Sequence, residues 1–149
     1  MEIENKWMKL ALCEARKAEL KGEVPVGAVI VRDNKLISKA HNQPIANTDP
    51  TAHAEIQAIR LASKSLNNYR LTGLTIYVTL EPCIMCLGAI ANARISKIFF
   101  GAYDAKSGAC CSCLNSSNKH FINHKIEIVG GVLSSDSKAL LQSIFKTKR

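Results

Sequence analysis

The first twenty residues alternate apolar and charged positions with the period of an α-helix. Apolar side chains recur at steps of four, four and three positions, at Trp7, Ala11, Ala15 and Ala18. Glu and Lys occupy most of the positions between them. This pattern predicts an amphipathic helix over residues 2–21, which Gly22 ends.

The next segment changes to the pattern of a β-hairpin. The β-branched run Gly27–Arg32 is followed by Asp33-Asn34 and then by Leu36-Ile37. Asp and Asn tolerate the left-handed backbone that a two-residue turn requires, so we expect two antiparallel strands. Pro44 and Pro50 then predict an irregular loop. A helix should start near Thr51, with the hydroxyl as its cap, and run to about Lys64.

The rest of the chain alternates strands and helices. Its patterns predict a strand at 74–80, a helix at 83–93, strands at 95–100 and 125–129, a last helix at 134–145, and a polar loop at 101–118. This order predicts a three-layer α/β/α fold: a central mixed five-stranded sheet with helices on both faces. With no internal repeat or linker, residues 1–149 should form one domain. Ligands should bind where strands lead into helix N-termini.

Charge and composition narrow the possible environments. The 149 residues carry 20 Lys and Arg against 12 Asp and Glu, a net charge of +8. This excess favours a polyanionic partner, although it could also serve solubility alone. No apolar run approaches the ~18 residues of a membrane span, and Glu2 and Glu4 are unlike a secretory signal. We therefore expect no membrane association, a cytoplasmic location, and cysteines that are thiols or metal ligands.

The strongest chemical signal lies in two short motifs that open helices. His53-Ala-Glu55 opens one predicted helix and Pro82-Cys83-Ile-Met-Cys86 opens another. Cys83 and Cys86 lie about 60° apart around a helix, so both sulfurs can face one ion, and the helix N-terminus favours thiolates. Two thiolates and one imidazole suit Zn²⁺ and leave a fourth position for water, which is typical of a catalytic site.

Glu55 is better placed to carry protons than to bind the metal. It follows His53 by two residues, about 200° around a regular helix, so the two side chains cannot both grip one ion from the helix surface. The geometry works if the metal lies beyond the helix end, where Glu55 can reach the bound water. A closed structural zinc site remains an alternative, with its fourth ligand from Cys110, Cys111, Cys113, His120 or His124.

Longer stretches around these motifs resemble a known family. They are Glu23-Val-Pro-Val-Gly-Ala28, Asp49-Pro-Thr-Ala-His-Ala-Glu55, Thr79-Leu-Glu-Pro-Cys-Ile-Met-Cys86 and Phe100-Gly-Ala-Tyr-Asp-Ala-Lys-Ser-Gly108. Over almost the whole chain, about 7–145, the sequence resembles the bacterial tRNA-specific adenosine deaminase (TadA) family, within the cytidine deaminase-like zinc enzymes. One departure from the family pattern is the cysteine cluster at 110, 111 and 113.

The resemblance implies a reaction and a role for each motif residue. His53, Cys83 and Cys86 would bind one zinc ion per subunit. Glu55 would shuttle protons while zinc-bound hydroxide attacks adenine C6, converting adenosine 34, the wobble base of the anticodon, to inosine. The family substrate is the arginine tRNA with anticodon ACG, and the family is homodimeric. Asn42 would hydrogen-bond the purine, and the loop carrying Asp104 would lie against the anticodon nucleotides.

The C-terminal helix carries a further candidate RNA contact. Phe145, Lys146 and Arg149 together fit a base-stacking surface beside phosphate contacts. A core phenylalanine followed by a solvated basic tail is the alternative.

Two other functions share the zinc motif. Deamination of a free base or nucleoside such as guanine or cytidine would not require the positive charge or the basic last helix. A non-catalytic, zinc-stabilised RNA-binding module would make Glu55 dispensable.

Overall fold

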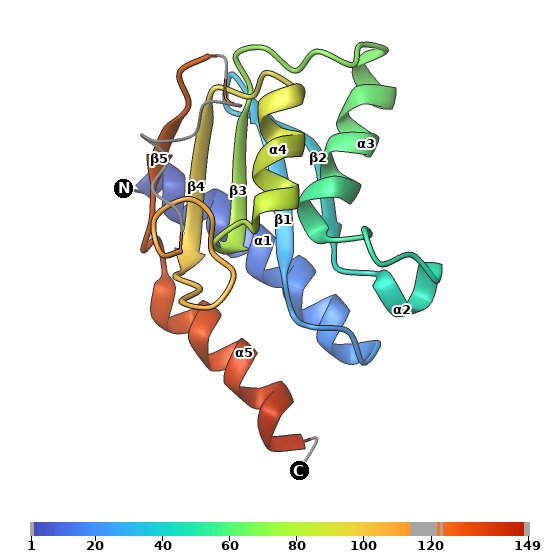
Figure 1. Cartoon of the computed structure of the whole chain (residues 1–149), viewed down its shortest axis with the longest axis vertical. Coiled ribbons are helices and arrows are strands. Elements are labelled where there is room, and N and C mark those ends of the chain that lie inside the picture. Colours follow the sequence, from blue (N-terminus) through green and yellow to red (C-terminus); the bar gives the residue numbers. More distant parts are fainter. Residues whose placement is uncertain (1, 114–121, 123, 148–149) are drawn as a thin grey trace.

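The computed structural model describes residues 2–113, 122 and 124–147, and places a five-stranded sheet between two layers of helices (Figure 1). Along the chain the elements are α1 (Glu2–Leu20), β1 (Gly27–Arg32), β2 (Lys35–His41), α2 (Pro44–Asn47), α3 (Ala54–Leu66), β3 (Thr75–Leu80), α4 (Ile84–Asn92), β4 (Lys97–Ala102), β5 (Glu127–Val129) and α5 (Ser134–Thr147). The expected order of strands and helices is confirmed, with one short helix added.

The sheet is mixed, as the sequence predicts. Its strands lie in the order β2-β1-β3-β4-β5. β1 pairs antiparallel with both β2 and β3, whereas β3 with β4 and β4 with β5 are parallel. Asp33 and Asn34 form the hairpin turn between β1 and β2, both with positive φ, at 49° and 60°. The turn therefore has the left-handed backbone that these two residue types tolerate.

Each face of the sheet has its own apolar core. On one face, Ala58 and Ala62 of α3 and Leu87 and Ile90 of α4 pack on inward-facing strand residues such as Ile76. On the other face, α1 contributes its predicted apolar stripe, including Trp7 and Ala11, to a second core that Leu140 of α5 also joins. The alternation of side chains along β1, β3 and β4 supplies both cores. These two helical layers confirm the three-layer α/β/α prediction.

Helix α2 lies inside the segment predicted as irregular. Pro44 occupies its first turn, where a missing N–H costs nothing. The carboxylate of Glu23 accepts hydrogen bonds from the N–H groups of Ile45 at 3.1 Å and Ala46 at 2.8 Å. A carboxylate from a distant segment therefore stabilises this helical turn, which local pattern alone could not indicate.

The edges of several other elements differ from the prediction. β4 runs over Lys97–Ala102 because the N–H of Ile95 still bonds to Ile90 at the end of α4, and Ala102 still pairs with Leu80. β5 begins at Glu127, later than predicted, and α5 continues to Thr147. The described helices include none long and apolar enough to cross a membrane.

Candidate metal and catalytic site

His53 lies just outside α3, at its N-terminal end. Its backbone is extended, with φ −70° and ψ 156°, so the ring projects past the helix end instead of from the helix surface. Glu55 lies inside the first turn. The angular separation of about 200° that applies on a regular helix therefore does not separate these two side chains. This is the arrangement that a shared metal site beyond the helix end requires.

The predicted start of this helix at Thr51 is wrong. The Thr51 hydroxyl donates to Asp49 Oδ1 at 2.7 Å and does not cap the helix. Instead the side chain of Asn42, after β2, accepts a hydrogen bond from the N–H of Ala54 at 2.9 Å. Asn42 lies 12 residues before Ala54, so the residues next to the start of the helix do not indicate this cap. Asn42 thereby fixes where α3 begins and where His53 points.

Cys83 and Cys86 meet His53 at the N-terminal end of α4. Cys83 is the residue immediately before that helix and Cys86 lies in its first turn. His53 Nδ1 lies 3.5 Å from Cys86 Sγ and 3.8 Å from Cys83 Sγ. A tetrahedral zinc ion with ordinary Zn–S and Zn–N bonds places sulfur and nitrogen ligands about 3.6 Å apart. The three ligand atoms, all within 4.8 Å of one another, therefore fit zinc.

Four of the five candidates for a fourth protein ligand belong to the described residues, and none of these four joins the cluster. Among the described residues, the one cluster of at least three possible metal ligands is His53, Cys83 and Cys86. Cys113 Sγ donates to the carbonyl of Ala105, and His124 Nε2 lies 2.9 Å from the carbonyl of Ile95, before β4. The side chain of Cys110 is buried in the α3–α4 core, Cys111 is exposed, and His120 lies outside the described residues. The described part of the chain thus favours an open site over a closed one.

The two cysteines have opposite electrostatic character. Hydrogen bonding with Cys86, and then with His53, lowers the pKa of Cys83 to about 4. The same interaction with Cys83, together with burial, raises the pKa of Cys86. The hydrogen bond with Cys83 also raises the pKa of His53. At neutral pH the cluster thus contains a thiolate at the helix N-terminus, ready to bind a cation.

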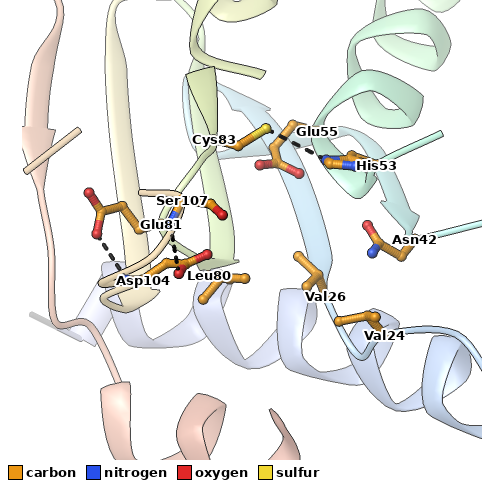
Figure 2. A pocket seen from close by; sticks show the side chains of 10 residues that line it. All are labelled: Val24, Val26, Asn42, His53, Glu55, Leu80, Glu81, Cys83, Asp104 and Ser107. Carbon is orange, nitrogen blue, oxygen red and sulfur yellow. Dashed lines mark hydrogen bonds between the residues drawn. The ribbon is translucent and has the colours of Figure 1, made fainter. Parts of the chain in front are cut away.

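Glu55 is a buried carboxyl group directed into the same space. Its side chain is 4% exposed, and Figure 2 shows it between His53 and Cys83. Burial raises its pKa from 4.5 to about 7, because the ionised form loses its hydration. A group with a pKa near the operating pH can both accept and donate a proton. This is the property that a proton shuttle requires.

A cavity of about 260 Å³ opens in front of these residues (Figure 2). This volume is just below the ~300–1,000 Å³ typical of drug-sized ligands and favours a single ring system. Val24, Val26 and Leu80 supply apolar walls, and the polar side chains of Asn42, Asp104 and Ser107 also line the cavity. The cavity therefore combines an apolar slot with a few polar groups, the usual composition of a small-ligand site.

The predicted substrate contacts have different outcomes. Asn42 lines the cavity, and because its oxygen caps α3, its amide nitrogen is the atom that can donate to a ligand. Asp104 also lines the cavity, and its Oδ1 accepts hydrogen bonds from the N–H groups of Lys106 and Ser107, both at 3.1 Å. Phe145 and Lys146 belong to the last turn of α5, where only the backbone is described, and Arg149 lies outside the described residues.

Two buried carboxylates near this site are not among the predicted site residues. Glu23 and Glu81 are each 2% exposed, and both accept backbone hydrogen bonds from other segments. Glu81 lines the cavity directly. Burial raises the pKa of Glu81, but hydrogen bonds from Ser112 and from backbone N–H groups outweigh it, and the pKa is lowered. The signal in the sequence is a charged residue, Glu81, directly after the buried strand predicted at 74–80.

Comparison with known proteins identifies several similar chains. The family profile of MafB19-like deaminases matches residues 2–149. The tRNA-specific adenosine deaminase of Haemophilus influenzae is 46% identical, covering 99% of this chain and 86% of its own length. The enzyme of the same name from Buchnera aphidicola (subsp. Baizongia pistaciae) is 51% identical, covering 96% of this chain and 88% of its own length.

A solved structure agrees with these sequence matches. It comes from work on A-to-I editing by tRNA:A34 deaminases at the wobble position of transfer RNA. It superposes with a TM-score of 0.88 at 43% identity, covering 91% of this chain and 99% of its own. The likeness thus extends over nearly the whole chain in both sequence and fold.

Proposed function

This chain belongs to the tRNA-specific adenosine deaminase family, and on that basis we propose that it converts adenosine 34, the wobble base of a tRNA anticodon, to inosine. The observation that carries the proposal is the convergence of His53, Cys83 and Cys86 beside the buried carboxyl of Glu55, at the end of a small cavity. The specific substrate we propose is the arginine tRNA with anticodon ACG, which the family resemblance implies.

The metal proposed for this site is one zinc ion per chain, held by His53, Cys83 and Cys86. Zinc, when bound, lowers the pKa of a coordinated water toward neutrality and so supplies a nucleophile at neutral pH. Glu55 would receive the proton that this water gives up. The net reaction adds water at adenine C6 and releases ammonia.

Glu55 transfers protons in the proposed reaction. After accepting a proton from water, its carboxyl group can donate to N1 of the adenine, which draws electrons from the ring and promotes attack at C6. It can then take a second proton, from the hydroxyl group added at C6, and pass it to the departing amino group, so that ammonia leaves and the C6 carbonyl of inosine forms. The burial that raises its pKa to about 7 supports both roles, because neither protonation state is strongly favoured at neutral pH.

The cavity walls orient the base. Asn42 donates its amide N–H to the purine, while its oxygen holds the start of α3. Asp104 and Ser107 lie in the cavity wall, from which the anticodon nucleotides can be reached. A base in an anticodon loop needs little unstacking to enter such a cavity, since the loop already exposes it.

The RNA and a second subunit would use surfaces outside the cavity. The net charge of +8, with Lys146 and Arg149 near the C-terminus, supports contact with phosphates, and Phe145 could stack on a base. For the homodimer, α4 offers a helix without charged residues, on which Ile84 is 56% exposed. We further propose that the chain is one deaminase domain and acts in the cytoplasm.

The deciding experiment compares substrates. Zinc-loaded protein is incubated with a tRNA bearing adenine at the wobble position and, separately, with free adenosine, cytidine and guanine, and inosine and ammonia are measured. Inosine at that one position with no reaction on the free compounds is the expected result. Ammonia from a free compound with an unchanged tRNA would instead support a base or nucleoside deaminase.

Replacing the proton carrier separates an enzyme from a binding module. Glu55→Ala should keep zinc and tRNA binding but lose turnover by at least the ~10²-fold typical of general acid–base catalysis. A non-catalytic, zinc-stabilised RNA-binding module would lose nothing on this substitution. Metal content, tRNA affinity and inosine formation are measured on the same preparation.

A further inference from the structure

Glu81 occupies a position that the proposed chemistry does not explain. It follows β3 directly and precedes Pro82 and the zinc ligand Cys83, yet it is no part of the metal cluster. Its side chain is 2% exposed, and it lines the cavity on the same side as Asp104 (Figure 2). Burying a carboxylate is costly unless hydrogen bonds compensate for the lost hydration. The partners of this group therefore indicate its purpose.

All the hydrogen bonds described for this carboxylate come from one loop. Oε2 accepts the backbone N–H groups of Cys110 at 3.1 Å, Cys111 at 2.7 Å and Ser112 at 2.9 Å. Oε1 accepts the N–H of Asp104 at 3.0 Å and the hydroxyl of Ser112. An ionised carboxylate has only acceptor sites, so it suits this set of donors. Glu81 thus bonds to both ends of the loop formed by residues 104–112.

The loop is shaped around the carboxylate. Gly108 lies so close to Glu81 that a Cβ atom at this position would overlap the carboxylate group. The N–H of Ala109 donates to the carbonyl of Pro82 at 2.8 Å, which adds a backbone tie beside Cys83. Between these attachment points the loop presents Asp104 and Ser107 to the cavity. The position of this cavity wall therefore depends on Glu81.

We propose that Glu81 is a positioning residue for the deamination, holding the 104–112 loop in place as one wall of the substrate cavity. The proposal rests on the function proposed above. Glu81 is not a member of the His53, Cys83 and Cys86 cluster, and the proposed reaction does not use it to carry a proton. It acts through the loop, by matching its two carboxylate oxygens to four backbone N–H groups and one hydroxyl.

Glu81→Gln replaces one of the two carboxylate oxygens, each of which accepts hydrogen bonds from the loop, with an NH₂ group that cannot accept them, and it hardly changes the size of the side chain. If the amide nitrogen replaces Oε2, three backbone N–H groups lose their acceptor, and if it replaces Oε1, the N–H of Asp104 does. We expect KM for the tRNA to rise about tenfold, with kcat changed less than about threefold, because a binding wall is loosened while the proton carrier stays. Zinc content should be unchanged. Glu81→Asp retains both acceptors and should recover part of the loss.

A second readout follows the loop without any enzymatic activity. Cys110 belongs to this loop, and its side chain is 1% exposed because it packs into the core, whereas Cys13, Cys111 and Cys113 are exposed. In the zinc-loaded protein, an alkylating reagent followed by peptide mass spectrometry should label Cys110 at least about tenfold faster in Glu81→Gln than in the natural protein. Gly108→Ala should raise the Cys110 labelling rate and KM in the same direction, because its Cβ displaces the carboxylate.

A matched control is Glu14→Gln. Glu14 is also a buried carboxylate, 4% exposed, but it bonds to Lys17 and His41 on the α1 side of the sheet. The Glu14→Gln substitution should leave the Cys110 labelling rate unchanged. If Glu81→Gln and Gly108→Ala both keep the natural KM and the slow labelling of Cys110, the proposal is wrong. If the natural protein does not deaminate tRNA, the proposed function fails, whereas the labelling still reports whether Glu81 holds the loop.

Discussion

Removing the charge of Glu55 should stabilise the zinc-free protein although it abolishes the reaction. Burial raises the pKa of this group from 4.5 in an exposed state to about 7 in the folded chain. The unfolded chain hydrates the ionised carboxylate freely, whereas the folded chain does not. Above neutral pH the folded protein must therefore keep an ionised group in an unfavourable place, and Glu55→Gln relieves this cost.

The size and sign of the effect follow from proton linkage. Since one pH unit corresponds to about 1.4 kcal/mol, a rise from 4.5 to about 7 is equivalent to about 3 kcal/mol. The folded state binds the proton more tightly than the unfolded state. The stability that protonated Glu55 contributes to the folded state is therefore fully present below pH 4.5 and is lost as the pH rises through about 7. Glu55→Gln has no such loss. Its advantage should be negligible at low pH, grow through this window and level off above it.

Urea denaturation with a chelator and a thiol reductant, from about pH 5 to about pH 9, measures this difference. For a chain of this size, 3 kcal/mol corresponds to a rise in Tm of roughly 6–12 °C. Glu127→Gln is the control, because Glu127 is an exposed carboxylate paired with Lys97, and its effect should stay within about 0.5 kcal/mol. A Glu55→Gln protein that is no more stable than the natural one above neutral pH, or a difference independent of pH, would refute the reasoning.

Three further outcomes are expected. Cys83→Ser should lose zinc, measured as metal content by elemental analysis, because a serine hydroxyl does not replace a thiolate ligand; retained zinc would argue against the assigned site. Gly27→Ala should cost about 2 kcal/mol in urea denaturation, because its Cβ would overlap the carbonyl of Ala11 where α1 crosses β1, and an unchanged midpoint would contradict this close packing. Deleting residues 145–149 should weaken tRNA binding and reduce the slope of log K against log salt by up to about 2, with zinc content unchanged; an unaltered slope would assign the phosphate contacts to other residues.

Much of the fold could be predicted because its signals are local. The apolar spacing around Trp7 and the Asp33-Asn34 turn each reflect interactions within a few residues, and both elements form where expected. The alternation of strand and helix in the middle of the chain favours parallel pairing there, and β3 does pair parallel with β4 across α4. Errors occurred at element ends, such as the start of β4, where Ile95 is buried like a strand residue although its backbone still closes α4.

Short sequence motifs likewise indicate the chemical groups of the candidate site. His53, Glu55, Cys83 and Cys86 are recognisable from residue type and spacing, because zinc selects thiolate and imidazole ligands in a few arrangements. The sequence shows that His53 and Glu55 can share one site only if the metal lies beyond the helix end. Whether His53 lies outside the helix, as this requires, was decided by the tertiary structure. The extended backbone at His53 is a consequence of tertiary contacts, including the cap from Asn42.

The sequence by itself determined the reactive groups, the layered α/β architecture and the basic charge, because each is encoded in residue types and short-range periods. Only the tertiary structure decided which polar groups meet. Asn42 caps a helix 12 residues away, Glu23 bonds to residues 22 and 23 positions away, and Glu81 bonds to a loop 23–31 positions away. A buried carboxylate takes its partners from whatever the fold brings within about 3 Å, and that proximity has no signature in the local sequence.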